Sequence, residues 1–213
     1  MVAPPLMLSD MSTTFDAKAA TWDEEPRRRA MAMDVVAAIT QQIPLAPGHR
    51  LMDVGCGTGL VGLPLASITG SVLGVDLSVE MVARFKAKAA AAKLTGVAAE
   101  VRNLVEDPLP GSSVDVVVSA MAFHHIDQID PMLHAIAGSL VPGGWLAIAD
   151  LETEDGSFHA EAVPHNGFDP VAFLDRMRCA GLVPASQQRV HVMRKPPSNR
   201  EYPIFLAIAR KPA

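Results

Sequence analysis

The chain has few cysteines, little basic charge and no long hydrophobic run. Its two cysteines, Cys56 and Cys179, lie far apart and neither belongs to a Cys-x-x-Cys pair, so we expect no structural disulfide, as suits a reducing compartment. The formal net charge is −5, and the largest basic cluster is Arg27-Arg28-Arg29. Such a cluster is more typical of a solvated helix face than of a nucleic-acid site. We therefore expect no nucleic-acid partner.

Segments that would direct the chain to or through a membrane are also missing from the sequence. Residues 1–8 lack the basic start and the long apolar region of a signal peptide. No apolar run approaches the ~20 residues needed to cross a bilayer. We expect a soluble, cytoplasmic protein without a membrane partner. Internal repeats and linkers are absent as well, and 213 residues suit a single compact domain.

Apolar strands alternate with amphipathic helices along the chain, which is typical of a parallel sheet covered by helices on both faces. Helical spacing runs from Pro26 to Ile43, and Ser78 is expected to cap a long helix that reaches Leu94. The predicted strands lie at 51–54, 71–76, 97–102, 114–119, 144–150, 187–193 and 203–210, the last two as an antiparallel hairpin.

Three prolines give sharper predictions about where helices begin. Asp130-Pro131 and Asp169-Pro170 are each expected to open a helix, with the aspartate as N-cap and the proline as the first helical residue. Pro64 falls in the second turn of a helix expected to reach about Ile68. Since proline removes a backbone hydrogen bond, that helix should start late or kink.

The stretch Asp53-Val54-Gly55-Cys56-Gly57-Thr58-Gly59 joins the first strand to a helix. Glycines at these positions permit a tight turn and let backbone N–H groups approach a ligand closely. A second carboxylate, Asp76, ends the next apolar run, at the distance where nucleoside-binding α/β units place an acid on the ribose. The sequence therefore predicts a nucleoside-bearing cofactor.

Two cofactors compete for this loop. Residues 57–62 satisfy the G-x-G-x-x-G pattern of dinucleotide enzymes, in which the glycines receive a pyrophosphate. A carboxylate at Asp53 would repel that group. It suits a ligand with positive charge near the loop, such as the α-ammonium or sulfonium of S-adenosylmethionine. An NAD-dependent oxidoreductase is the alternative enzyme class.

The loop motif resembles the first motif of the class I S-adenosylmethionine-dependent methyltransferases. The resemblance spans about residues 50–150, and its nearest look-alikes are small-molecule methyltransferases with a His-His pair after the fourth strand. It also includes Gly74-Val75-Asp76-Leu77-Ser78, Asn103-Leu104, Val114-Asp115-Val116-Val117-Val118-Ser119, His124-His125 and Leu140-Val141-Pro142-Gly143-Gly144.

The resemblance implies a fold and a division of the chain. We expect an α/β domain with a single Rossmann-like, doubly wound, mostly parallel seven-stranded sheet, a C-terminal antiparallel hairpin and an N-terminal helical lid. After a flexible start at 1–12, residues 13–213 would form the methyltransferase domain. Within it, 13–45 would be the lid, 50–150 the cofactor-binding core and 151–213 the substrate-side segment with the hairpin.

The resemblance also implies which residues hold S-adenosylmethionine. The loop residues would hold its methionine end, Asp76 both ribose hydroxyls, and the residues around Asn103 the adenine. The family usually has an acid at the position of Asn103, whose amide oxygen can still accept a hydrogen bond from the adenine amine. The expected cofactor residues are Asp53, Gly55, Cys56, Gly57, Gly59, Asp76, Leu77, Met81, Asn103, Leu104, Ser119 and Ala120.

Histidines gather where an acceptor should bind. His124 and His125 follow the fourth strand, at the carboxyl edge where doubly wound sheets bind ligands, and His159 and His165 lie in a later irregular segment expected over the same edge. His124 and His165 are candidate bases, although one ring of the His-His pair could instead pack locally. The histidines lack the i, i+4 helical spacing of strong zinc motifs, so we expect no metal site.

Three further residues are expected near the acceptor: Trp22, Phe123 and, among the histidines, His159. Phe15 and Trp22, seven residues apart, would share one face of the lid helix, either over the ligands or packed in the core. The sequence thus predicts methyl transfer to a small-molecule acceptor by a monomer or homodimer. A non-catalytic protein that binds S-adenosylmethionine stays open as a third hypothesis.

Overall fold

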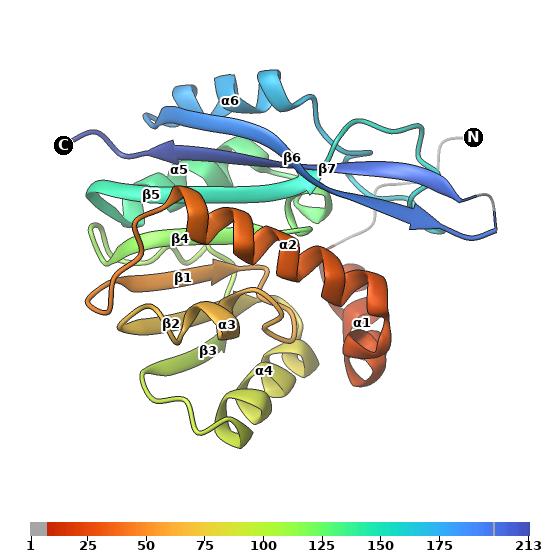
Figure 1. Cartoon of the computed structure of the whole chain (residues 1–213), viewed down its shortest axis with the longest axis horizontal. Helices are drawn as coiled ribbons and strands as arrows, with labels where there is room; N and C mark the ends of the chain where they lie inside the picture. The colour runs from red at the N-terminus through yellow and green to blue at the C-terminus, as the bar shows by residue number, and fades with distance from the viewer. Residues whose placement is uncertain (1–7, 198) are drawn as a thin grey trace.

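A single seven-stranded sheet forms the centre of the molecule, in a computed structural model that describes residues 8–197 and 199–213. The strand order is β3-β2-β1-β4-β5-β7-β6, with parallel pairing from β3 to β5, while β7 runs antiparallel to both β5 and β6 (Figure 1). The strands are β1 (Arg50–Val54), β2 (Ser71–Asp76), β3 (Val97–Val101), β4 (Val114–Ala120), β5 (Leu140–Leu151), β6 (Val183–Lys195) and β7 (Arg200–Arg210). The predicted mostly parallel sheet with a C-terminal hairpin is confirmed.

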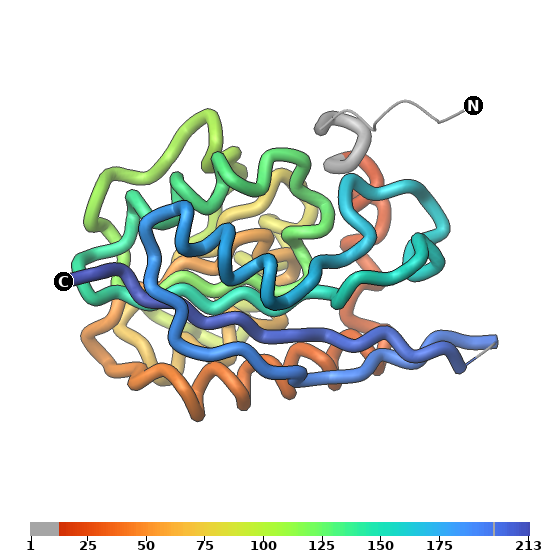
Figure 2. Tube along the Cα trace, turned by 90° about the horizontal axis from the view of Figure 1, so that it is seen from above, coloured from red at the N-terminus to blue at the C-terminus, as the bar shows by residue number. Residues whose placement is uncertain are grey.

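Helices cover both faces of this sheet, and an N-terminal helical segment lies by the carboxyl ends of the parallel strands (Figures 1 and 2). The helices are α1 (Leu8–Lys18), η1 (Ala19–Glu24), α2 (Pro26–Gln42), α3 (Gly62–Leu65), α4 (Val79–Ala91), η2 (Phe123–His125), α5 (Ile129–Ser139) and α6 (Pro170–Cys179). The helices α2 and α6 both contact the hairpin strand β6, one from each side.

Strand side chains alternate between two hydrophobic cores, as the two-residue period of a strand requires. Leu51 joins the core under α2 and α4, where Ile39 and Phe85 are fully buried. The next residue, Met52, joins the core under α5 and α6. Both faces of the central strands are therefore apolar, which explains their nearly continuous hydrophobic sequence.

Some predicted helix starts hold and one does not. The hydroxyl of Ser78 accepts a hydrogen bond from the backbone N–H of Met81 at 3.1 Å, and Asp169 caps α6 as predicted. The N-cap prediction for Asp130 is wrong, because α5 begins at Ile129, whose side chain is buried. Burial of that side chain extends the helix past the predicted cap, and Asp130 instead accepts a hydrogen bond from Arg176 at 2.9 Å.

Two other predictions on helices need correction. The helix that contains Pro64 is a single turn, Gly62–Leu65, and does not reach Ile68. At the N-terminus, α1 begins at Leu8, within the segment 1–12 predicted to be flexible; residues 1–7 lie outside the described part. The change from α1 to the 3₁₀ helix η1 after Lys18 means that no single α-helical face carries Phe15 and Trp22.

The strand β6 forms one edge of the sheet and departs twice from a regular ladder. Its register with β7 shifts between Pro184 and Ser186 and again between Arg189 and His191. Arg189 pairs with Glu152 of the segment that follows β5. This edge is therefore irregular as well as charged.

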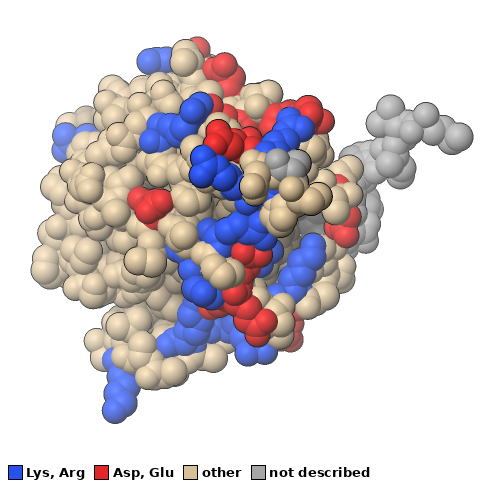
Figure 3. Space-filling view, turned by 45° about the vertical axis from the view of Figure 1, so that its right-hand side comes forward, with Lys and Arg blue, Asp and Glu red and all other residues tan. Residues whose placement is uncertain are grey.

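Charged side chains of both signs are interleaved on the face drawn in Figure 3. Ion pairs in the structure include Arg27 with Glu25, Lys88 with Asp23, Arg194 with Glu201 and Arg200 with Asp155. On this face the acidic side chains lie beside the basic ones and pair with several of them. Among the helices of residues 8–197 and 199–213, none has the length and apolar character to span a membrane.

The core under α5 and α6 gives a direct test of the fold. Phe205 of β7 is fully buried, with its ring 5.6 Å from that of Phe173 in α6. We expect Phe205→Ala to lower the free energy of unfolding by about 3–5 kcal/mol, because it leaves a cavity. Urea unfolding measures this. The control Val171→Ala, at a position 65% exposed, should stay within about 0.5 kcal/mol; equal effects of the two variants would contradict this packing.

Candidate functional site

The glycine loop between β1 and α3 is fixed to the end of the neighbouring strand. The backbone N–H groups of Gly55 and Cys56 both donate to the carbonyl oxygen of Val75, at 2.8 and 3.1 Å. Gly55, Gly57 and Gly59 all have positive φ angles, of 66°, 50° and 87°, which side chains with a Cβ rarely adopt. The backbone conformation by itself therefore accounts for glycine at all three positions.

The three glycines differ in what surrounds them. A Cβ at Gly55 would lie 2.3 Å from that of Ala122, and one at Gly59 would lie 2.7 Å from Leu63 and Phe85. A Cβ at Gly57 would meet only the sulfur of Met81, at 4.0 Å. Gly55 and Gly59 are therefore packed against the protein, and Gly57 is the glycine with room beside it.

Asp53, at the end of β1, is almost completely buried. Its carboxylate accepts a hydrogen bond from the backbone N–H of Gly62 at 2.9 Å and so holds the start of α3. Burial raises the pKa of Asp53 to about 7, and the nearby charge of Asp76 adds to the rise. A buried carboxylate of this kind is stabilised by a cation, and an approaching anion would raise its free energy further.

Asp76, at the end of β2, is braced by backbone donors. Its two oxygens accept hydrogen bonds from the N–H groups of Gly57, at 2.8 Å, and Ser78, at 2.9 Å. Burial raises the pKa of Asp76, and these hydrogen bonds partly oppose that rise. The bond to Gly57 joins the second carboxylate directly to the loop that follows the first, so the two predicted acids meet in one site.

The N-terminal segment is attached over this site by two carboxylates. Asp16 of α1 accepts hydrogen bonds from the Ser78 hydroxyl at 2.5 Å and from the backbone N–H of Glu80 at 3.1 Å. Asp23 of η1 accepts from the Thr58 hydroxyl at 2.5 Å and pairs with Lys88 at 2.6 Å. The first helices thus contact both the glycine loop and α4.

Other residues predicted to bind the cofactor surround these carboxylates. Leu77 is exposed, whereas Met81, Leu104 and Cys56 are buried. The amide oxygen of Asn103 accepts a hydrogen bond from the backbone N–H of Val105 at 3.1 Å. The Ser119 hydroxyl donates to the carbonyl of Val54 at 2.7 Å, and Ala120 follows it at the end of β4. Asn103 and Ser119 therefore already have partners within the protein.

A buried histidine–aspartate pair lies next to the end of β4. Nδ1 of His124 is 2.5 Å from a carboxylate oxygen of Asp150, which is fully buried and is the second-last residue of β5. The same carboxylate accepts from the backbone N–H groups of His124 and Leu151, at 3.2 and 2.7 Å. These contacts fix the ring of His124, whose Nε2 is buried and has no hydrogen-bond partner in the described protein.

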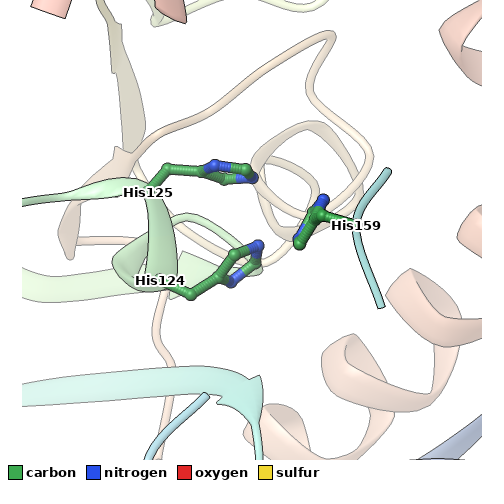
Figure 4. A group of neighbouring side chains, drawn as sticks. All are labelled: His124, His125 and His159. Carbon is green, nitrogen blue, oxygen red and sulfur yellow. The ribbon is translucent and has the colours of Figure 1, made fainter. Parts of the chain in front are cut away.

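Three histidine rings gather at this point (Figure 4). The rings of His124 and His125 are 4.1 Å apart, and the ring of His159 lies 4.9 Å from each of them. One nitrogen from each ring can be chosen so that all three lie within 4.8 Å of one another. His159 comes from the irregular segment after β5, so the predicted overlap of that segment with the carboxyl edge of β4 is present. We call these three residues the histidine cluster.

Burial keeps two members of the cluster neutral. Burial, with smaller contributions from neighbouring histidine and lysine charges, lowers the pKa of His125 to about 2 and that of His159 to about 3, and the charge of Asp150 partly opposes the shift of His159. At neutral pH both rings therefore present a lone pair rather than a second proton. Phe15 of α1 covers the cluster, with its ring 5.0 Å from that of His125.

The remaining predicted residues are more scattered. The backbone N–H of His165 donates to the carbonyl of His124 at 3.2 Å, but its ring lies against Phe168 and outside the histidine cluster. Phe123 is fully buried against Phe173 in the core. Trp22 meets the ring of Phe15 at 5.7 Å, so the lid aromatics pack together despite the break in the helix.

A hollow of about 410 Å³ opens beside the histidine cluster. Its walls include Ser157, His159, Lys195, Arg200 and Tyr202. A second hollow, of about 300 Å³, lies between η1 and α4 and reaches Thr58 of the glycine loop. The two hollows therefore approach the site from the hairpin side and from the α4 side.

Four residues of the site escaped the sequence analysis. Asp16, Asp23, Asp150 and Lys195 contribute through contacts with elements far away in the sequence, and no local motif marks them. Asp150 is the last residue of the predicted strand 144–150, as Asp76 is of 71–76, and Asp53 is next to last in 51–54. A carboxylate at the end of a predicted strand was therefore the available signal.

Comparison with known proteins points to one family. A family described as "Methyltransferase domain" matches residues 52–148. The 27-O-demethylrifamycin SV methyltransferase of Amycolatopsis mediterranei is 30% identical over 188 residues, covering 82% of this chain and 69% of the relative. An uncharacterized methyltransferase of Schizosaccharomyces pombe is 29% identical over 152 residues, or 63% of this chain and 54% of the relative. The chain thus spans about half the length of the second relative.

A solved structure has the same fold. A chain of the complex between the Haloferax volcanii Trm112 methyltransferase activator and a methyltransferase superposes with a TM-score of 0.79. The match covers 93% of this chain and 98% of that chain, at 22% identity. At 22% identity the match shows a shared fold only. The Trm112 activator is a partner of the Haloferax volcanii protein.

Proposed function

This chain belongs to the class I S-adenosylmethionine-dependent methyltransferases, and on that premise we propose that it transfers the methyl group of S-adenosylmethionine to a small-molecule acceptor. The single observation that carries the proposal is the pair of carboxylates joined by the glycine loop, the buried Asp53 and the partly buried Asp76. The methyl group leaves a sulfonium, so the reactive power belongs to the cofactor. The protein has to hold both reactants in line and exclude water.

The electrostatics of the loop support S-adenosylmethionine over NAD. Burial raises the pKa of both carboxylates, so an anionic diphosphate at Gly57 would add repulsion to an already unfavourable burial of charge. The positively charged amino group at the methionine end of S-adenosylmethionine would instead stabilise the ionised carboxylates. We propose that Asp53 attracts this end, Asp76 binds the ribose hydroxyls, and Leu77, Asn103 and Leu104 surround the adenine.

We propose that the acceptor binds at the histidine cluster, with the 410 Å³ hollow as its entrance. The relative from Amycolatopsis mediterranei acts, by its name, on a rifamycin, a small molecule. In this chain, the rings of Phe15 and Phe158 lie against the cluster, an arrangement that suits a compact acceptor better than an extended peptide. We leave Phe123 out of the acceptor site because it is part of the core.

His124 is the residue we propose to contact the reacting group of the acceptor. Asp150 holds Nδ1, which directs the unpartnered Nε2 toward the cluster. In this orientation Nε2 can take the proton that an acceptor hydroxyl or amine loses during methyl transfer. His165 is a less direct candidate, because its ring faces Phe168.

Ligand binding separates the two cofactors. We expect S-adenosylhomocysteine, and not NAD, to raise the melting temperature of the chain. Asp76→Ala should weaken S-adenosylhomocysteine binding by about a hundredfold or more, because it removes two hydrogen bonds to a charged group, each worth about 1.5–3 kcal/mol. Titration calorimetry measures this loss. Asp115→Asn is the matched control, since Asp115 pairs with Arg50 at the opposite end of the strands; unchanged affinity in Asp76→Ala would refute the ribose assignment.

The affinity for S-adenosylhomocysteine should depend on pH through Asp53. The pKa of this carboxyl is about 7 in the ligand-free chain, and only its ionised form attracts an ammonium group. Affinity should therefore rise about tenfold from pH 6 to pH 8, as the ionised fraction grows. Calorimetry at several pH values tests this, and Asp53→Asn should flatten the profile. A profile equally steep in that variant would assign the titration to another group.

Methyl transfer itself is tested with labelled S-adenosylmethionine and a panel of small hydroxyl- and amine-bearing metabolites. For an acceptor that is methylated, His124→Gln should lower kcat by about 10²–10⁴-fold, the range typical of a general base. Binding of S-adenosylhomocysteine should stay within about threefold in that variant. Tight cofactor binding without transfer to any acceptor would favour a non-catalytic binding protein.

A further inference from the structure

We propose that the histidine cluster is a binding site for one divalent transition-metal ion, with Zn²⁺ as the best match to its ligands. His124, His125 and His159 would each contribute one imidazole nitrogen. Imidazole is a preferred ligand of zinc and of its neighbours in the first transition row. Three protein ligands leave a fourth position open for water or for another small ligand, which is the arrangement of catalytic rather than structural zinc sites.

The first support is the geometry of the cluster. The three nitrogens lie within 4.8 Å of one another, and the rings face a common space in Figure 4. With Zn–N bonds of about 2.0–2.1 Å, tetrahedral ligand atoms are about 3.4 Å apart. The most distant pair therefore has to close by about 1.4 Å. Ring rotation of the half-buried His125 and His159 can supply this movement, while His124 stays fixed.

The second support is an unpartnered polar atom that is deeply buried. The ring of His124 is only 1% exposed, and its Nε2 lacks a hydrogen-bond partner in the described protein, as does Nε2 of His159. A buried polar atom without a partner costs about 1–3 kcal/mol. A metal ion that accepts both lone pairs removes that cost at two positions together.

The third support is the partner of His124 on the other side of its ring. Asp150 contacts Nδ1 at 2.5 Å, and carboxylates that hold the second nitrogen of a histidine in this way orient it as a metal ligand and increase its basicity. Lys18 and Lys195 lie close enough to lower the pKa of cluster histidines. The positive charges of these lysines disfavour binding of a cation, and the negative charge of the buried Asp150 offsets that repulsion.

A bound ion has a consequence for the same ring nitrogen. Nε2 of His124 cannot hold a metal ion and take a proton from an acceptor together, so the loaded and empty chains are distinct functional states. This consequence rests on the proposed function, whereas binding of the ion does not. The test therefore measures metal directly, without cofactor or acceptor.

The experiment loads the full chain, stripped with a chelator, with Zn²⁺ and measures stoichiometry by calorimetry and by elemental analysis after gel filtration. Co²⁺ provides an absorption spectrum that reports tetrahedral nitrogen ligation. We expect one ion per chain. His159→Ala should weaken Zn²⁺ binding more than a hundredfold, and Asp150→Asn about 10–100-fold. His134→Ala, which removes an exposed histidine outside the cluster, is the matched control and should bind as the wild type does.

Two outcomes would overturn the site: no stoichiometric ion in the wild type, or equal binding in His159→Ala and His134→Ala. Thermal melting of each metal-free variant shows whether the variant is folded, so that weaker metal binding is not mistaken for unfolding. If Asp150→Asn fails to fold, His125→Ala takes its place, because that ring is only half-buried. A wild-type chain that transfers methyl groups but binds no stoichiometric metal ion would reject this site alone. Metal binding without methyl transfer would reject the proposed function alone.

Discussion

The site depends on the parallel alignment of β1 between β2 and β4. In this alignment the carbonyl of Val75 receives two N–H groups of the glycine loop, so the loop turns over the end of β2 and meets Asp76. The same register brings Asp53 and Val118 side by side in β1 and β4, which places the end of β4 and the histidines after it at the same edge. A slip of one residue would turn Asp53 toward the opposite face. Sheet register therefore fixes the positions of both carboxylates and of His124.

Most of the fold was predictable because its signals are local. Hydrophobic strands, the glycine loop and the cap at Ser78 each involve residues within a few positions of one another. Asp130 and Asp169 show where local signals stop. Both precede a proline, yet only Asp169 is an N-cap, because burial of Ile129 extends α5 by residues that a capping rule treats as loop. Tertiary packing determined the difference, and no short window of sequence contains it.

Site residues that belong to local sequence motifs could be predicted, and those that meet through tertiary contacts could not. Asp53 and Asp76 follow from strand ends and glycine spacing, and the structure joins them as expected. Asp150 could not be assigned to His124, because the two residues meet only through the pairing of β4 with β5. The sequence likewise could not show that His159 lies beside His124 and His125, because His159 comes from another segment. Neither Asp16 nor Asp23 belongs to a motif, although both attach the first helices to the cofactor side.

The irregular outer strand β6 bears on how the chain behaves at high concentration. A regular, uncharged strand at the border of a sheet exposes unpaired N–H and C=O groups to which a strand of another molecule can pair. Here the register of β6 shifts twice along its length, and Arg189 and Arg194 place charged groups on the same strand. Both features disfavour edge-to-edge pairing of two copies of the chain through β6.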